Sequence, residues 1–150
     1  MKKMILVFCA LLLLTAPAFS HCQIPCGIYD DEMRLDMIEE DILTVEKSMN
    51  QINELSKAQE KDYNQIVRWV DNKETHADKI SETASYYFMA QRVTPAGMED
   101  KEGYALYARK LALLHELIYY SMKAKQTTDL SYVEKLRSAL KGFRDVYSQN

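Results

Sequence analysis

From residue 30 onward, hydrophobic residues recur at intervals of three and four positions, which is the spacing of one face of an α-helix. Four such stripes follow one another, and none shows the period of two that is typical of a strand. Their members are Leu35, Ile38, Ile42, Val45, Met49 and Ile52; Ile66, Val70, Ala77, Ile80, Ala84 and Tyr87, with Lys73 as a polar member; Tyr104, Tyr107, Leu111, Leu114, Ile118 and Met122; and Val133, Leu136, Leu140, Phe143 and Tyr147. The pattern predicts four amphipathic helices with their apolar faces in a core.

The first two helices are bounded by polar residues. Asp30 or Asp31 can cap the first helix, and the acidic residues that follow suit its positive N-terminal end. Neither Gly nor Pro occurs between Asn53 and Asp62. We nevertheless expect a turn near residues 56–60, because one continuous helix of about sixty residues would be out of proportion for a small domain.

The later boundaries carry stronger signals. Residues 93–97 contain Pro95 and a glycine, which predict a break in the chain. Residues 127–129 interrupt the third stripe, and Ser131 with Glu134 predicts a capping box for the last helix. Four amphipathic helices with short connections predict an all-α fold, an antiparallel (up-down) four-helix bundle with an N-terminal segment before it.

Length and charge narrow the class of protein. The 150 residues correspond to a single domain, with 27% charged and 47% hydrophobic residues. The net charge is −3, and the first twenty residues contribute Lys2 and Lys3 but no acid, so the remainder carries −5. An acidic domain without a basic block is not expected to bind nucleic acid.

The first twenty residues have the pattern of a secretion signal. Lys2 and Lys3 form a basic start, an apolar run extends from Met4 to Leu14, and Ala18-Phe19-Ser20 supplies small residues at a cleavage site. The run is shorter than the roughly 20 apolar residues that span a bilayer. We therefore expect residues 1–20 to be removed after Ser20. Residues 21–150 would then be exported, to the periplasm or outside the cell, with no stable membrane association.

Two metal sites that occur in other helical proteins are excluded by spacing. A di-iron bundle needs Glu three residues before His on two helices, whereas Lys73 and Ala112 precede His76 and His115. Attachment of haem needs Cys-x-x-Cys-His, whereas three residues separate the two cysteines that remain after cleavage, Cys22 and Cys26. His76 and His115 are therefore interpreted as ordinary helix residues.

Cleavage after Ser20 would place three donor atoms in succession at the new terminus. They are the amine of His21, the backbone nitrogen of Cys22 and the thiolate of Cys22, and Pro25 with Gly27 can bend the chain so that the Cys26 thiolate adds a fourth. A planar set of two nitrogens and two sulfurs favours Ni(II) or Cu(II), and the His21 imidazole can reach an axial position. The negative donors would also stabilise a higher oxidation state.

A disulfide between Cys22 and Cys26 is the alternative, because exported proteins meet oxidising surroundings. The chain would then be a noncatalytic, disulfide-bonded helical protein. An exported metal-binding protein without catalytic activity is a further alternative. The position of His21 directly after the cleavage site favours metal binding.

The segment His-Cys-x-x-Pro-Cys-Gly-x-Tyr at residues 21–29 resembles the nickel hook of nickel-dependent superoxide dismutases. The matching residues are His21, Cys22, Pro25, Cys26, Gly27 and Tyr29. The family's four-helix bundle is compatible with the helices predicted here. In family members a Glu of the first helix and an Arg of a neighbouring chain hold the axial imidazole. Asp36 falls near that Glu only if one residue is deleted, and no counterpart of the Arg is identified.

This resemblance implies the function and the site. The His21 amine, the Cys22 amide nitrogen and the thiolates of Cys22 and Cys26 would bind one nickel ion per chain, and the His21 imidazole would join axially in the oxidised state. Superoxide would be disproportionated to oxygen and hydrogen peroxide as nickel alternates between Ni(II) and Ni(III). Tyr29 would stand over the open face and help to admit the small anion, and the protein would be a homohexamer.

Overall fold

The computed structural model of the chain describes residues 24–148. In this part, four α-helices and one π-helix occur, and no strand is present: α2 (Asp31–Lys57), α3 (Tyr63–Glu82), the π-helix η1 (Thr83–Arg92), α4 (Lys101–Gln126) and α5 (Ser131–Tyr147). The predicted signal peptide and the hook residues His21 and Cys22 lie outside the described residues. The all-α prediction is confirmed.

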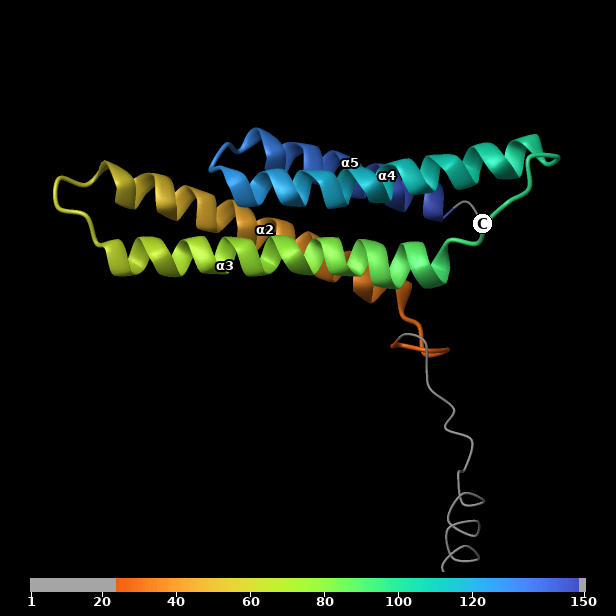
Figure 1. The fold of residues 1–150 in the computed structure, drawn as a ribbon, viewed down its shortest axis with the longest axis horizontal. Helices are drawn as coiled ribbons and strands as arrows, with labels where there is room; N and C mark the ends of the chain where they lie inside the picture. The colour runs from red at the N-terminus through yellow and green to blue at the C-terminus, as the bar shows by residue number, and fades with distance from the viewer. Residues whose placement is uncertain (1–23, 149–150) are drawn as a thin grey trace, which may run out of the picture.

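The helices form an up-down bundle (Figure 1). Helix α2 packs against α3, α3 against α4, α4 against α5, and α5 against α2, with η1 continuing the direction of α3. Successive helices run in opposite directions, as short connections require. The hook residues leave the bundle at the end where α2 begins and where η1 and α5 end. This end is therefore where three elements can act on the hook.

Two of the predicted stripes coincide with the buried face of their helix. All six apolar residues of the α2 stripe are buried, and so are four of the five in the α5 stripe, with Tyr147 partly buried. The stripe through α3 and η1 is buried from Lys73 to Tyr87, whereas Ile66 and Val70 near the start of α3 are only partly covered. The core is thus built as the periodicity predicted over most of the bundle.

The predicted face of α4 is only partly right, because Tyr107, Leu111 and Ile118 pack at the edge of the core without being fully buried. Tyr104 and Met122 are 39% and 41% exposed, and only Leu114 of the predicted stripe is buried. The buried face is instead formed by Lys110, Leu113, Leu114, Leu117, Ser121 and Ala124. This buried face includes the polar residues Lys110 and Ser121, and apolar residues also occupy the neighbouring face. The spacing of hydrophobic residues therefore does not show which of the two faces is buried.

Lys73 is buried although it carries an ammonium group. Its side chain lies at 3% exposure in α3, and Nζ donates to the carbonyl oxygens of Ala124 at 2.7 Å, Lys125 and Thr127. These oxygens belong to the last turn and C-terminal end of α4, where carbonyl groups lack partners within the helix. The lysine therefore ties α3 to the end of α4.

Aspartates cap three of the helices. Asp30, Asp62 and Asp100 each accept a hydrogen bond from the backbone amide three residues further on, at 3.0 Å. The predicted turn between the first two helices is confirmed, because α2 ends at Lys57 and α3 begins at Tyr63. The break predicted at residues 93–97 is also confirmed, since it lies between η1 and α4.

The capping box predicted for the last helix is wrong. Ser131 is already the first residue of α5, and no side chain caps Leu130, which precedes it. The Ser131 amide donates to the Asp129 carboxylate at 2.9 Å, and the Glu134 carboxylate accepts from Arg137 at 2.8 Å instead of turning back to the helix start. The hydrogen bonds that a capping box requires between Ser131 and Glu134 are therefore replaced by bonds to Asp129 and Arg137.

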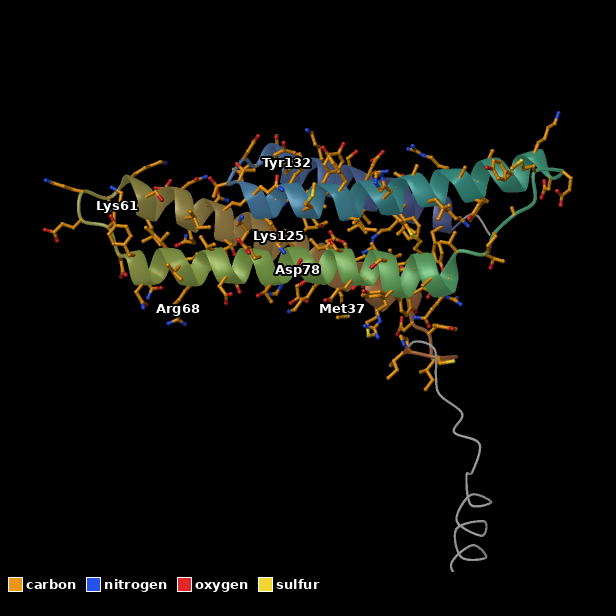
Figure 2. All side chains as sticks on the ribbon, in the orientation of Figure 1. Met37, Lys61, Arg68, Asp78, Lys125 and Tyr132 are labelled. Atoms are coloured by element: carbon orange, nitrogen blue, oxygen red, sulfur yellow. The ribbon has the colours of Figure 1, made fainter. Side chains whose placement is uncertain are left out.

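Ion pairs connect helices on the surface of the bundle. Lys125 of α4 donates to Asp78 of α3 at 2.8 Å, and Figure 2 labels this pair between the two helices. Arg137 of α5 pairs with Glu46 of α2. None of the helices in the described part of the chain is both long and apolar enough to cross a membrane.

Candidate metal centre

The described part of the hook contains one of the predicted nickel ligands. Cys26 is exposed and forms no disulfide with any residue from 24 to 148. Gly27 follows it with φ of 79°, a left-handed conformation that residues with a Cβ rarely adopt. The turn predicted from Gly27 is therefore present, and it leaves the Cys26 thiol accessible.

Cys26 and Tyr29 line the same cleft. The cleft has a volume of about 460 Å³ and is formed by hook residues together with Met33 and Arg34 of the first turn of α2. Ile24 and Ile28 beside it are 86% and 82% exposed. Of the four predicted site residues, the structure thus brings Cys26 and Tyr29 to one place, while His21 and Cys22 fall outside the described range.

Tyr29 anchors the hook through its ring. The ring meets Tyr87 of η1 edge-on at 5.9 Å between centroids, and the guanidinium carbon of Arg92 lies 4.2 Å from its centroid. Tyr87 in turn contacts Phe88 at 4.9 Å, and Phe88 contacts Phe143 of α5 at 5.1 Å. A continuous row of rings therefore links the hook to the core.

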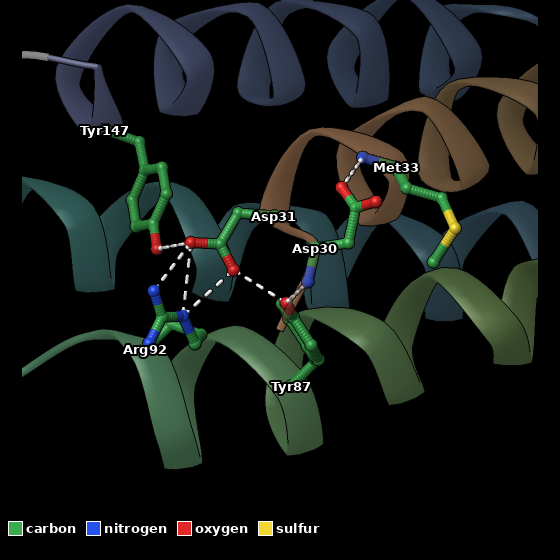
Figure 3. Close-up of polar contacts among 6 residues, drawn as sticks. All are labelled: Asp30, Asp31, Met33, Tyr87, Arg92 and Tyr147. Carbon is green, nitrogen blue, oxygen red and sulfur yellow. Dashed lines mark hydrogen bonds and ion pairs between the residues drawn. The ribbon is translucent and has the colours of Figure 1, made fainter. Parts of the chain in front are cut away.

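The first residue of α2, Asp31, accepts hydrogen bonds from two other elements (Figure 3). Arg92 at the end of η1 donates to it from Nε at 2.9 Å and from Nη2 at 2.8 Å. The hydroxyl of Tyr87 donates at 2.6 Å and that of Tyr147 of α5 at 2.7 Å. The Asp30 amide donates to the Tyr87 oxygen at 2.9 Å. The base of the hook is thus held from two sides.

These contacts change the acidity of the groups involved. Burial raises the pKa of Asp31, but the hydrogen bonds from Arg92, Tyr87 and Tyr147 outweigh burial and lower the pKa to about 2. Burial and the hydrogen bond to Asp31 raise the pKa of Tyr87 and of Tyr147 to about 12. At neutral pH, the site therefore holds a charged carboxylate and two protonated phenols that donate to it.

Two other predicted residues lie apart from this site. The Nδ1 atom of His76 is 2.6 Å from a carboxylate oxygen of Asp41, and His115 packs beside the ring of Tyr119. Both lie within helices, in keeping with the interpretation as ordinary helix residues. Asp36, the possible counterpart of the family's Glu, accepts a hydrogen bond from Arg144 of α5 at 2.7 Å.

Sequence reasoning missed the residues around Asp31. The hydrophobic pattern places Tyr87 and Tyr147 in the core and carries no signal for Arg92. Tyr87, Arg92 and Tyr147 lie 56, 61 and 116 positions from Asp31. No local pattern connects groups so far apart. The one available signal was the aspartate next to the hook.

The donor chemistry around Cys26 fits nickel. An accessible thiol on a tight turn can supply a thiolate to a soft, planar metal site. No group of three His, Cys, Asp or Glu residues within residues 24–148 is placed to hold a metal ion. The described residues therefore provide no rival metal site.

The fold and the cleft define a helical-bundle protein with a cysteine-bearing segment at its N-terminal end. The model of the nickel-containing superoxide dismutase family matches residues 16–150, and the chain belongs to this family. Membership makes the chain an enzyme that uses nickel and acts on superoxide. Neither the comparison with characterised proteins nor that with solved structures gives a match.

Proposed function

We propose that the mature chain begins at His21 and disproportionates superoxide with nickel held by the hook, residues 21–29. The amine of His21, the amide nitrogen and thiolate of Cys22, and the thiolate of Cys26 would hold the ion, and the His21 imidazole would join them when the nickel is oxidised. The observation that carries the proposal is the accessible Cys26 thiol beside Tyr29, in a hook motif within the family match.

Bound nickel supplies a one-electron couple between Ni(II) and Ni(III), so that two superoxide ions and two protons give one oxygen and one hydrogen peroxide. The residues of the chain would admit superoxide, a small anion, and hold the thiolates in position. Its net charge is negative, so attraction of superoxide depends on local positive groups. Arg34 lines the cleft beside Cys26 and is such a group.

Tyr29 stands at the mouth of the cleft in this proposal. The residue is 39% exposed, and Tyr87 and Arg92 contact its ring from the bundle side. A ring held in this way restricts the space over the thiolates to small molecules. The thiolates are then protected from larger oxidants, although the peroxide product remains small enough to reach them.

A free terminal amine at His21 gives the sharpest test. We expect the chain from His21 to 150, loaded with nickel, to be active in proportion to its bound nickel. One additional residue before His21 converts the amine into an amide and should abolish the activity. The same residue added after position 150 is the matched control and should leave the activity unchanged. Full activity of the N-terminally extended chain would contradict the proposed ligand set.

Mass spectrometry of the native protein separates the proposal from its alternatives. We expect a mature chain that starts at His21 and carries one nickel ion with both thiols reduced. A metal-free chain lacking two hydrogen atoms would indicate the Cys22–Cys26 disulfide instead. Bound nickel without turnover of superoxide would indicate a noncatalytic metal-binding protein.

We further propose that the chain is exported, to the periplasm or outside the cell, and assembles as a homohexamer. The basic and apolar pattern of residues 1–20 supports export. The exposed apolar residues Ile24, Ile28 and Met33 around the cleft support cover by a neighbouring subunit. Cell fractionation and light scattering of the purified mature protein test the two statements. An intracellular, monomeric protein would contradict both.

A further inference from the structure

Arg92 occupies an unusual position in the backbone. It is the last residue of η1, and the amide of the next residue, Val93, donates to the carbonyl of Phe88 five positions earlier at 2.9 Å. This is the hydrogen bond of a π-helix, a conformation that is frequent at functional sites. Tyr87 and Arg92 are also five positions apart, and in an α-helix they would point about 140° away from each other. In η1 both reach Asp31 (Figure 3).

The guanidinium group of Arg92 makes two different contacts at once. Its edge donates to both carboxylate oxygens of Asp31, from Nε at 2.9 Å and from Nη2 at 2.8 Å. Its carbon lies 4.2 Å from the centroid of the Tyr29 ring. A planar guanidinium can pair with a carboxylate and lie near an aromatic ring at the same time, whereas an ammonium cannot reproduce this geometry.

The two partners of Arg92 lie on either side of the junction between hook and bundle. Tyr29 belongs to the hook and follows Cys26 by three residues, and Asp31 is the first residue of α2. Ile24 and Ile28 of the hook are exposed and do not bury their side chains in the bundle. The direction in which the hook leaves α2 therefore depends on the contacts of Tyr29 and of the Asp30 amide with η1.

We propose that Arg92 is a positioning residue for the reaction, which fixes the Tyr29 ring against η1 and thereby holds the turn at Cys26 in the geometry that binds nickel. This inference rests on the proposed function, because it assigns the nickel site to the hook. In this proposal Arg92 affects the nickel site through its contact with Tyr29 and touches neither nickel nor superoxide. Loss of the guanidinium contact with the Tyr29 ring should loosen the hook even where the ion pair with Asp31 persists.

The test uses Arg92→Lys, which keeps the charge and a contact to Asp31 but loses the guanidinium over the Tyr29 ring. Arg137→Lys is the matched control, because Arg137 of α5 also pairs with a carboxylate of α2, that of Glu46. Glu46 lies fifteen residues along α2 from Asp31, or about 22 Å. Both variants replace an arginine of the bundle that pairs with a carboxylate of α2, and only Arg92→Lys alters a contact of the hook.

Nickel release to a competing chelator is the main readout, measured on the nickel-loaded mature protein. We expect Arg92→Lys to release nickel about threefold faster, as expected for the loss of a partly exposed cation–π contact. Arg137→Lys should release nickel at the unaltered rate, even if it lowers the unfolding temperature as much. Equal release rates for Arg92→Lys and the unaltered protein would overturn the proposal.

A double-mutant cycle tests whether Arg92 acts through Tyr29. We expect Tyr29→Leu alone to accelerate release, and Arg92→Lys to add little in that background. Independent, multiplying effects would show that Arg92 acts on the fold alone and would overturn the inference. Tyr29→Phe keeps the ring and should preserve the effect of Arg92→Lys.

A measurement on the metal-free protein distinguishes failure of this inference from failure of the proposed function. The NMR signals of the Tyr29 ring are expected to shift in Arg92→Lys and to stay in place in Arg137→Lys. If the unaltered chain binds no nickel at the hook, the proposed function fails, while this readout still decides whether Arg92 orients Tyr29. An unshifted Tyr29 ring in Arg92→Lys would overturn the inference in either case.

Discussion

Asp31 accepts more hydrogen bonds than are needed to stabilise the start of a helix. A carboxylate in the first turn already benefits from the helix dipole. Here it also accepts hydrogen bonds from Arg92, Tyr87 and Tyr147, which lower its pKa to about 2 even though burial acts in the opposite direction. The ionised form is therefore favoured by the folded state more than by the unfolded chain.

This shift gives the stability a defined pH dependence. The folded pKa of Asp31, about 2, is lower than the ordinary value of 3.8, so its contribution is complete above about pH 4 and is lost as the pH falls toward 2. We expect Asp31→Asn to lower the free energy of unfolding by about 2 kcal/mol at pH 7 and to weaken the dependence between pH 4 and 2. Urea unfolding at several pH values measures both effects.

The control is an exposed aspartate of α5. Asp145 pairs with Lys141 on the surface, with its side chain 58% exposed. Asp145→Asn should change the free energy of unfolding by less than about 0.5 kcal/mol. If Asp31→Asn and Asp145→Asn behaved alike, the hydrogen bonds to Asp31 would contribute nothing to stability.

The role of a single residue could be predicted from the sequence where its contact partners lie close to it along the chain. The cap at Asp30 and the turn at Gly27 depend on neighbours within three residues, and both are present. The contact of Asp31 with Tyr147 depends on how α5 packs, so only the fold reveals it. His21 and Cys22 remain predictions, because they lie outside the described residues.

Among the helices, α4 shows the limit of periodicity. Apolar residues occupy two adjoining faces of α4, and the one that is buried contains Lys110 and Ser121. A stripe of hydrophobic residues identifies the helix but fixes its rotation only when the opposite face is polar. In α2 the exposed residues are mostly polar, with Met33, Met37 and Leu43 as exceptions, and the predicted face is confirmed.

Two adjacent residues of α4 test its rotation. Leu117 is fully buried, whereas its neighbour Ile118, which the sequence pattern placed in the core, is only partly buried. We expect Leu117→Ala to lower the free energy of unfolding by about 2–5 kcal/mol, and Ile118→Ala to cost less than half as much. Chemical denaturation of the two variants compares them directly. The opposite order would show that α4 is turned the other way.

In the whole molecule, the hook contacts the bundle through Tyr29, while the described metal-ligand residue lies outside the buried core. The core is formed by side chains of α2, α3, η1, α4 and α5, and Cys26, the predicted nickel ligand among residues 24–148, is not part of it. Cys26 lies outside it, on an exposed turn beyond the start of α2. The fold therefore does not need the metal to bury its apolar surface.

Removal of nickel should separate activity from fold. We expect a chelator to abolish superoxide disproportionation and to leave the far-ultraviolet circular dichroism of the helices unchanged. This contrasts with small metal domains, which unfold when the metal is withdrawn. Readdition of nickel should restore the activity. A loss of helical signal on chelation would show that the metal also supports the bundle.

The contact of Tyr147 with Asp31 has a practical consequence for anyone who produces this protein. Tyr147 is the last residue of α5, and its hydroxyl binds the base of the hook at 2.7 Å. An affinity tag placed directly after α5 would begin next to the residue that contacts Asp31. In the proposed mature chain, a tag before His21 would convert the terminal amine into an amide. The connection between Lys57 and Tyr63 lies at the opposite end of the bundle (Figure 1) and is the better place for an inserted label.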